Sequence, residues 1–467
     1  MSPLTRAAGK TFRSLRIRNY RLYFAGQIVS MSGTWMQIVA QSWLVLRLTG
    51  SGVALGLITA LQFVPVLVAG AWGGTLADRF DKRMLATWTQ VVAAVLALSL
   101  GLVVATGVVE LWMVYVFAFL LGCVAVVDVP ARQSFVMEMV PEEDVPNAIG
   151  LNTTIFTSAR IVGPAIAAVL ISAVGLSWCF FINGISFIAV IAGLLAMDPS
   201  ELRKVPRVGR KKGQVREGLR YVWMTPELRS TLLLMTVVGT LAFNFRVLLP
   251  LMAESVFGGG AGVYGLLSSV MGVGTLFGAL VSAGRARPSR ALLVGSTVLF
   301  GALMIAAAAA PNLALELAAL IPLGAVSIIF VATANSTLQL NSTDAMRGRV
   351  MALYSVVFLG STPIGSPFVG WLAEAVNVRV AFLVPGVATL AAGIWAVYGL
   401  REAKLADGDI EIAPLPEDPS FWSHAIARPA RTLEAAGRWI RGTAADLATR
   451  YHHRRPDRPG DLDDGLD

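Results

Sequence analysis

The chain has 467 residues, of which 55% are hydrophobic and only 14% are charged. An ordinary soluble domain carries about a quarter charged residues, so this composition excludes a typical soluble protein. The formal net charge is +9, but the basic residues are confined largely to short polar stretches. This distribution favours membrane topology and contact with anionic lipid, and no nucleic-acid partner is expected.

Twelve apolar runs follow one another along the chain, and each has the roughly 20 to 25 residues that a helix needs to cross a bilayer. The period-two alternation of a membrane β-barrel is absent. The sequence therefore predicts an all-α, polytopic membrane protein with twelve transmembrane helices. The predicted spans are 21–46, 52–77, 84–107, 111–131, 147–172, 175–197, 230–255, 262–283, 290–310, 313–337, 348–373 and 379–400.

The longest internal polar segment divides the spans into two halves of six. Gly70 and Gly74 in the second span recur at the same separation as Gly274 and Gly278 in the eighth, as expected for structural repeats. Close helix packing is the favoured role of these glycines themselves. The predicted domains are a basic N-terminal arm (1–20), an N-terminal six-helix bundle (21–197), a basic linker (198–229), a C-terminal six-helix bundle (230–400) and a polar tail (401–467).

The distribution of Lys and Arg predicts the orientation. Nearly all of the 38 basic residues lie on the side shared by the N-terminal arm, alternate loops and the tail, whereas the opposite side carries only Arg47 and Arg379. By the positive-inside rule, both termini are expected in the cytoplasm and the protein in the cytoplasmic (inner) membrane. Within the linker, 215–221 is predicted to form a short amphipathic helix on the membrane surface.

Chemistry-bearing residues are few. Cys123 and Cys179 lie inside predicted spans, and all three histidines lie in the tail, which argues against an intramembrane histidine relay or metal site. No nucleophile with an adjacent base and no phosphate-binding glycine loop is present, so neither an enzyme nor a bound cofactor is predicted. The expected partners are the lipid bilayer and a small-molecule substrate, with a monomer as the expected state.

The loop between the second and third spans, 73–83, carries the most specific pattern. The carboxylate of Asp78 can lie against the positive N-terminal end of a neighbouring helix, while Arg79, Lys82 and Arg83 can reach acidic partners. Such contacts would hold a cytoplasmic gate closed and would break when the two halves move. The alternative is that these charges only signal topology.

This loop resembles the signature of the major facilitator superfamily, with Asp81 in place of the second glycine. The resemblance extends over 15–400 and rests on three further segments, 18–35, 128–135 and 347–351. The set is similar to the drug-efflux branch that includes macrolide exporters and the enterobactin exporter. The resemblance implies export by alternating access, usually driven by a proton gradient, and it assigns Arg347 and Arg349 to the gate.

The fifth span contains Gly163 and Pro164, in a segment similar to the antiporter element of the superfamily. Alanines replace the two final glycines of that element. Because Pro164 removes a backbone donor, we expect a bend there that takes part in gating. A packing kink without any role in transport is the alternative.

Two arginines lie inside predicted spans: Arg160 halfway along the fifth and Arg246 in the seventh. A charge at the centre of a span costs roughly 2.5–3.5 kcal/mol on insertion scales, so each must face a wet cavity or a partner. We predict that one or both line a central cavity; hydrogen bonding to carbonyls between helices is the alternative. None of the 29 acids lies near the centre of a predicted span. The residues therefore favour a neutral or anionic substrate, such as a siderophore, over a cationic drug.

The same absence leaves few candidates for a proton carrier. Asp128 lies near the cytoplasmic end of the fourth predicted span, one turn from Arg132. Protonation of Asp128 would release Arg132 and change the gate contacts, although a static salt bridge is the alternative. The other groups predicted to line a cavity are Gln37, Gln41, Asn152, Phe156 and Asn244.

The leading interpretation is a proton-coupled antiporter that exports a drug-like compound or siderophore. Fold does not fix direction or substrate, so an importer or a lipid flippase on the same fold is an alternative. A second alternative is a membrane scaffold or sensor that transports nothing and acts through its tail.

Overall fold

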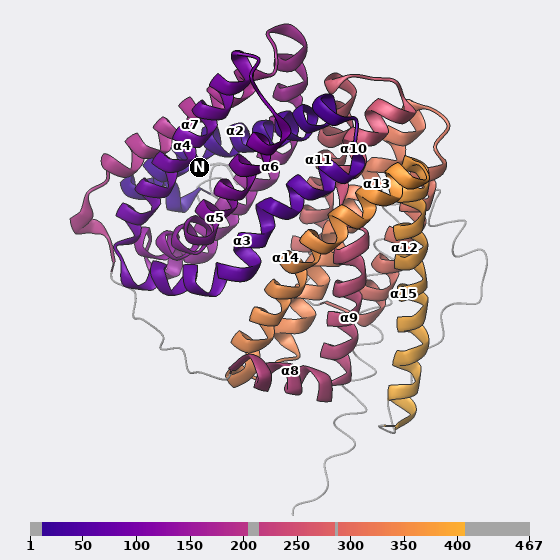
Figure 1. Ribbon diagram of the computed structural model, residues 1–467. Coiled ribbons are helices and arrows are strands. Elements are labelled where there is room, and N and C mark those ends of the chain that lie inside the picture. Colours follow the sequence, from indigo (N-terminus) through magenta and orange to yellow (C-terminus); the bar gives the residue numbers. More distant parts are fainter. Residues whose placement is uncertain (1–11, 204–213, 285–287, 407–467) are drawn as a thin grey trace, which may run out of the picture. The chain divides into compact units, whose positions relative to one another are not determined.

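The computed structural model describes residues 12–203, 214–284 and 288–406, which form helices joined by turns and short connections (Figure 1). The prediction of an all-α membrane protein is confirmed. The first half contains α2 (Arg18–Thr49), α3 (Gly52–Arg79), α4 (Lys82–Ala105), α5 (Leu111–Met139), α6 (Val145–Ala173) and α7 (Ser177–Leu195). The second half contains α9 (Pro226–Leu241), α10 (Phe245–Leu251) with the π-helical turn η4 (Met252–Val256), α11 (Ala261–Ala283), α12 (Arg290–Ala309), α13 (Leu313–Leu340), α14 (Asp344–Ala375) and α15 (Val378–Ala406).

Helix α5 is longer than the predicted span, which ended at residue 131. It continues to Met139, so Asp128 and Arg132 lie within one continuous helix. Pro130 does not end the helix, because a proline removes only one backbone donor. The hydroxyl of Ser134 donates to the Pro130 carbonyl (2.8 Å) one turn later. The charged pair is therefore part of the bundle interior rather than of a loop.

The seventh predicted span, 230–255, is broken in the structure. Helix α9 ends before Asn244, whose side-chain amide donates to the carbonyls of Thr240 (2.8 Å) and Leu241 (3.0 Å). Carbonyls at a helix end lack partners within the helix, and the Asn244 amide supplies hydrogen-bond donors to two of them at the break. The chain then restarts as α10, which carries Arg246 in its first turn.

Eleven of the described helical segments are long and apolar enough to cross a membrane. Among the twelve predicted spans, the first, which corresponds to α2, does not meet this criterion. Although α2 has 32 residues, it carries several polar side chains. Gln27, Ser30, Gln37 and Gln41 are each no more than 5% exposed. The polar face of α2 therefore points into the bundle rather than toward lipid.

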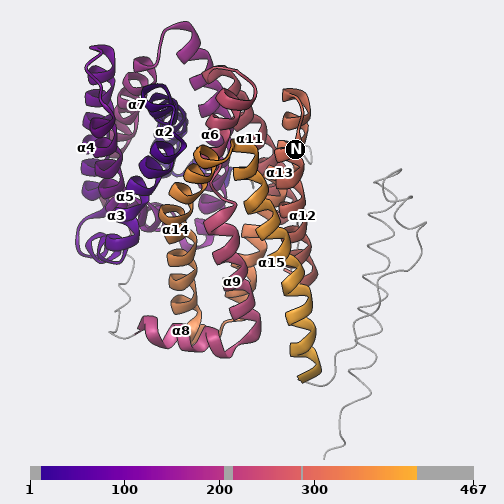
Figure 2. The ribbon, with the colours of Figure 1, turned by 45° about the vertical axis from the view of Figure 1, so that its right-hand side comes forward.

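The helices of the two halves pack in the same order. In the first half α3 packs on α5, and in the second half α11 packs on α13 (Figure 2). Between the halves, α3 packs on α14 and α6 packs on α11. The second helix of each half thus pairs with the fifth helix of the other, which is the exchange expected of repeated bundles.

Short elements pack against the bundle near the chain's N-terminal end. In η1 (Arg13–Arg16), Arg13 forms ion pairs with Glu143 (2.5 Å) and Asp144 (2.7 Å), in η2 (Glu142–Asp144) just before α6. A further turn, η3 (Pro199–Glu201), follows α7. These contacts fix the start of α6 against the segment that precedes α2.

The amphipathic helix predicted at 215–221 corresponds to α8 (Gln214–Met224), which lies across the ends of α9 and α14 (Figure 1). Glu217 of α8 forms an ion pair with Arg349 of α14 (2.8 Å). Parts of the predicted arm (1–11), linker (204–213) and tail (407–467) lie outside the described residues.

Candidate functional site

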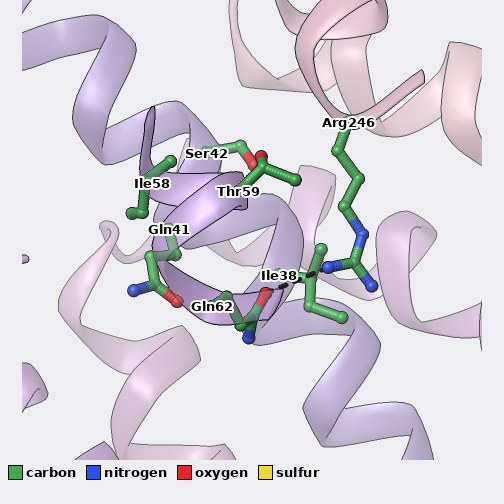
Figure 3. A pocket seen from close by; sticks show the side chains of 7 residues that line it. All are labelled: Ile38, Gln41, Ser42, Ile58, Thr59, Gln62 and Arg246. Carbon is green, nitrogen blue, oxygen red and sulfur yellow. Dashed lines mark hydrogen bonds between the residues drawn. The ribbon is translucent and has the colours of Figure 1, made fainter. Parts of the chain in front are cut away.

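Two arginines from different halves face one tryptophan. Arg160 comes from the middle of α6, and Arg246 comes from the first turn of α10. Their guanidinium carbons lie 5.6 and 5.7 Å from the ring centroid of Trp35 in α2. Arg246 also donates through Nη1 to Oε1 of Gln62 in α3 (3.0 Å), as Figure 3 shows, and lies 5.4 Å from the ring of Phe63. A cationic and aromatic site is thereby formed between the halves.

Neither arginine is neutralised within the described part of the chain, since no ion pair involves Arg160 or Arg246 there. The ring of Trp35 attracts both cations but carries no charge. Two cations in a partly buried site leave a positive field that an anion would relieve. The alternative prediction, that these arginines only bind carbonyls between helices, has no support in the described hydrogen bonds.

Some of the other residues predicted to line a cavity lie beside this site, whereas others form contacts between helices. The ring of Phe156, one helical turn before Arg160, meets Trp35 edge-on with centroids 5.6 Å apart. Asn152 lies one turn further back on α6 and is half-buried. Asn244 accepts from the Ser366 hydroxyl (2.8 Å) and ties α14 to the break after α9.

Gln37 and Gln41 line a different cavity, which lies inside the first half. The amide oxygen of Gln37 accepts from Nδ2 of Asn183 in α7 (2.6 Å). The cavity has a volume of about 160 Å³. Its polar lining comes from α2, α3, α4, α5 and α7, and includes Ser30, Thr34, Gln37, Gln41, Gln62, Gln90, Asp128, Arg132 and Asn183. A smaller pocket beside Arg246 is lined by Ile38, Gln41, Ser42, Ile58, Thr59 and Gln62 (Figure 3).

Asp128 and Arg132 form an ion pair at one end of this cavity (2.7 Å). Oδ1 of Asp128 also accepts from the Thr89 hydroxyl (2.8 Å) and from Nε2 of Gln90 (2.9 Å), both on α4. Arg132 donates to Oε1 of Gln27 (3.0 Å) on α2. Asp128 is 6% exposed, its carboxylate is held by side chains of α4 and α5, and Arg132 links the pair to α2.

The loop at 73–83 has a clear local structure. Asp81, which replaces the expected glycine, caps α4 by accepting from the backbone N–H of Met84 (2.8 Å). Lys82 forms an ion pair with Glu138 of α5, as predicted for an acidic partner. Arg79 is exposed, and the side chain of Asp78 lies outside what the structure describes.

Arg83 does not reach a carboxylate. Its Nε and Nη2 donate to the carbonyls of Leu194 (2.7 Å) and Leu195 (2.9 Å) at the end of α7. Carbonyls at a helix C-terminus lack partners within the helix and carry negative partial charge. They can therefore accept hydrogen bonds from an arginine in place of a carboxylate. The expectation of an acidic partner for Arg83 was therefore wrong.

The remaining predicted gate residues lie at helix contacts. Arg347 pairs with Asp344 (2.8 Å) at the start of α14, and Arg349 pairs with Glu217 as described above. On α6, a Cβ at Gly163 would lie 2.5 Å from the Trp35 Cβ, so only glycine lets α2 approach so closely. The helix continues through Pro164 to Ala173.

One contact between the halves was missed by sequence reasoning. Glu374 at the end of α14 accepts from the Ser51 hydroxyl (2.6 Å) and from the backbone N–H of Val53 (3.1 Å) in the first turn of α3. Glu374 thus caps α3 from the other half. The unpaired N–H groups and the helix dipole at the start of α3 favour a carboxylate there. The partners are more than 300 residues apart, so no local signal marks the pair.

The other bonds between the halves lie toward the same end. Ser269 of α11 donates to the Ile161 carbonyl (3.0 Å), and Arg246 binds Gln62. A Cβ at Gly52 would lie 2.5 Å from the Gly370 carbonyl, so α3 and α14 are in close backbone contact there. In the described part of the chain, the halves are therefore held together from the helix middles to the turn between α2 and α3.

Two six-helix bundles with exchanged second and fifth helices, and a charged site between them, are the arrangement of the major facilitator fold. A family model described as "Transmembrane secretion effector" matches residues 9–418, and the chain belongs to this family. It is thus a multi-pass membrane protein of the predicted superfamily.

Three relatives illustrate the family. The chain is 22% identical to the "Staphyloferrin A transporter" of Staphylococcus aureus, over 56% of this chain and 66% of the relative. It is 25% identical to "Macrolide efflux protein A" of Streptococcus pyogenes, over 52% and 62%. It is 28% identical to the "Multidrug efflux pump Tap" of Mycolicibacterium fortuitum, over 80% and 94%. The aligned chain thus spans slightly less than two thirds of the first two relatives.

A solved structure shares the fold. The bacterial homolog of the human lysosomal transporter Spinster, in an inward-facing and unoccupied conformation, superposes with a TM-score of 0.63 at 16% identity. The match covers 85% of this chain and 99% of that one. The likeness confirms the fold class predicted from the sequence.

Proposed function

We propose that this protein is a secondary transporter that exports a small molecule across the cytoplasmic membrane by alternating access. Two bundles that are joined at one end and enclose a charged site support this proposal. The relatives named as transporters and efflux proteins support it as well. With both termini in the cytoplasm, the joined end faces outward, and the site is reached from the cytoplasm.

The observation that carries the proposal is the pair of arginines facing Trp35 without an acidic partner among the described residues. Such a site favours a neutral or anionic substrate, because a cation would meet two like charges. Guanidinium groups bind carboxylates through paired hydrogen bonds, and Trp35 and Phe156 offer flat apolar surface beside them. A drug-like compound or siderophore that carries a carboxylate or acidic phenol fits these features.

Export against a gradient needs an energy source, and we propose exchange for protons. The sequence has no phosphate-binding glycine loop that would indicate use of ATP. Asp128 is a buried carboxylate with a switchable partner in Arg132, so proton binding there would alter an ion pair inside the first half.

Transport by inside-out vesicles tests this function. Vesicles with an acidified interior are given a hydroxycarboxylate siderophore, a catecholate siderophore or the cationic dye ethidium, and uptake is measured. We expect uptake of at least one of the two siderophores, little uptake of ethidium, and loss of uptake when the pH gradient is collapsed. Ethidium uptake in preference to both siderophores would contradict the substrate class.

Variants locate the site. Arg160→Ala is expected to lower siderophore uptake about ten- to hundredfold, because a charge-assisted hydrogen bond contributes about 1.5–3 kcal/mol. Arg229→Ala, which removes an exposed arginine at the start of α9, is the matched control and should leave uptake unchanged. Equal uptake by both variants would reject the arginine site.

The alternatives predict different outcomes. An importer that moves substrate together with protons would accumulate the siderophore in right-side-out vesicles with an acidic exterior, and a lipid flippase would move labelled lipid but not the siderophore. A scaffold would tolerate Arg160→Ala and respond to deletion of 407–467.

A further inference from the structure

A line of polar side chains runs along one face of α2. Its members recur at spacings of three and four residues, which place them on the same face of a helix. At about 1.5 Å a residue the line covers about 21 Å, or some two thirds of a hydrocarbon core about 30 Å thick. The residues are Gln27, Ser30, Thr34, Gln37 and Gln41.

This polar line faces the interior of the first half. Four of its members, Ser30, Thr34, Gln37 and Gln41, line the cavity of about 160 Å³, whose lining residues all come from α2, α3, α4, α5 and α7. The cavity adjoins the smaller pocket beside Arg246, because Ile38, Gln41 and Gln62 line both (Figure 3). A polar route thus leads through one bundle from Asp128 to the arginine site.

Two amides along the line have hydrogen-bonding capacity to spare. Nε2 of Gln27 and Nε2 of Gln41 are buried and donate to no group in the described part of the chain. Their residues are 1% and 5% exposed. Buried donors are almost always satisfied, by protein or by ordered water. A polar cavity of this size has room for about five water molecules at about 30 Å³ each, and these would accept from Nε2 of Gln41, which lines it.

Asp128 is the one carboxylate among the residues that line this cavity. The charged and titratable groups that act on it, among the described side chains, are Arg132 on its own helix and Tyr23 on α2. Thr89 and Gln90 of α4 hold Oδ1, so Oδ2 is the oxygen paired with Arg132. A proton that binds Oδ2 would break this ion pair and leave Arg132 bonded to Gln27.

The geometry points to a water-filled proton path inside the first half. Water bound along the polar line carries protons between the level of Arg246 and Asp128, separately from the space between the halves through which substrate moves. In this step a hydronium ion in the cavity gives its proton to Oδ2 of Asp128, and a water molecule remains. The inference rests on the proposed exchange of substrate for protons.

Hydroxyl-radical footprinting of the reconstituted protein tests for water in the cavity, since radicals formed from bound water oxidise adjacent side chains. Phe187 lines the cavity, whereas Phe180 on the same helix α7 packs in the apolar core. They are 7% and 0% exposed. We expect oxidation of Phe187 about tenfold faster than of Phe180 if water occupies the cavity. Equal rates would overturn the inference.

Two variants are designed to reduce the amount of water in the cavity. Ala93→Leu adds volume at a buried cavity residue, and Gln41→Met removes an amide at nearly constant size. Both should lower the oxidation rate of Phe187 to that of Phe180. Gln41→Met keeps the experiment decisive if Ala93→Leu does not fold. Unchanged oxidation in a folded variant would contradict a water path along α2.

The role of Asp128 is tested by measuring distances between spin labels at Thr75→Cys of α3 and Ala352→Cys of α14, both exposed, in a background with Cys123→Ser and Cys179→Ala. The wild-type populations should change at least about fivefold between acidic and alkaline buffer, a difference of about 1 kcal/mol between states. Asp128→Asn should remove that pH dependence while the protein remains folded. A pH response that persists in Asp128→Asn would overturn the inference.

These measurements need no substrate, so their outcome is independent of the vesicle test. Siderophore uptake with a dry cavity would reject the proton path alone. A wet cavity and a pH response that requires Asp128, without uptake of either siderophore, would support the path and reject the proposed substrate class.

Discussion

The two halves share an order of helix packing, but their interiors differ. The first half contains buried amides and an ion pair, with Gln37 bonded to Asn183 and Asp128 paired with Arg132. The second half has a cluster of phenylalanine rings beside the break between α9 and α10, with centroids 5.3–6.3 Å apart. The cluster consists of Phe243, Phe245, Phe300 and Phe358.

From this difference we infer that the two repeated bundles have different roles. Under our proposal the polar groups of the first half bind and move protons, whereas aromatic packing lies next to Arg246 in the second half. Phe243 and Phe245 flank Asn244, so the cluster fixes the break that places Arg246 beside Trp35. The two halves thus share their helix packing, and under this proposal their side chains give them different roles.

The largest effect on stability is expected in the aromatic cluster. Phe300 is 0% exposed, and Phe300→Ala should lower the free energy of unfolding by about 3–5 kcal/mol, because it leaves a cavity. Phe277, 57% exposed on α11, provides the control, and Phe277→Ala should change the free energy of unfolding little. Denaturant unfolding in lipid-like micelles measures both. Equal losses would show that the second half has no rigid core at this position.

The ion pair of the first half should come next. Asp128→Ala leaves the Arg132 guanidinium without its partner and should cost about 3 kcal/mol, somewhat less than a fully buried charge because Arg132 keeps some exposure. Asp344→Ala removes an exposed partner of Arg347 in the second half and should cost less than about 1 kcal/mol. The same unfolding measurement compares them. A similar cost for both would remove the contrast between polar interior and surface.

A smaller effect is expected at the amide pair. Gln37→Met deprives Nδ2 of Asn183 of its acceptor and should cost about 1–3 kcal/mol. Gln339→Met, at an exposed glutamine of α13, is the matched control. If thermal unfolding midpoints of the two variants coincide, the amides of the first half are not a satisfied network.

The smallest effect is expected where the halves meet. Glu374→Gln keeps an acceptor for Ser51 and Val53 but removes the charge at the start of α3, worth about 0.3–1 kcal/mol. The conformation in which the outer ends of the two halves are closed should therefore become about two- to fivefold less populated. Glu110→Gln, whose carboxylate contacts Trp112 near its own helix start, is the control. Spin-label distances across the outer ends of α3 and α14 measure the change, and no shift would mean that Glu374 does not hold the halves together.

Sequence patterns predicted the helices well because span length and hydropathy are local properties. They predicted less about helix ends: α5 runs past Pro130, and the side-chain amide of Asn244 stabilises a break inside the seventh span. The spacing of Gln27, Ser30, Thr34, Gln37 and Gln41 was present in the sequence, but single amides carry little information until the face they share is known.

Contacts between distant segments could not be predicted in the same way. No local pattern marks Glu374, because its partners Ser51 and Val53 lie in the other half. Arg83 was expected to meet an acid and instead binds the carbonyls that end α7. The roles of Arg160 and Arg246 stay predictions, although the structure brings both to Trp35.

Cross-linking of the outer ends of α3 and α14 tests alternating access most directly. Val53→Cys and Trp371→Cys, both exposed next to the Gly52–Gly370 contact, would be joined by a reducible linker in protein without Cys123 and Cys179. We predict that the linked protein binds the siderophore from the cytoplasmic side but does not move it, and that reduction restores uptake by inside-out vesicles. Full uptake with the link intact would contradict the account.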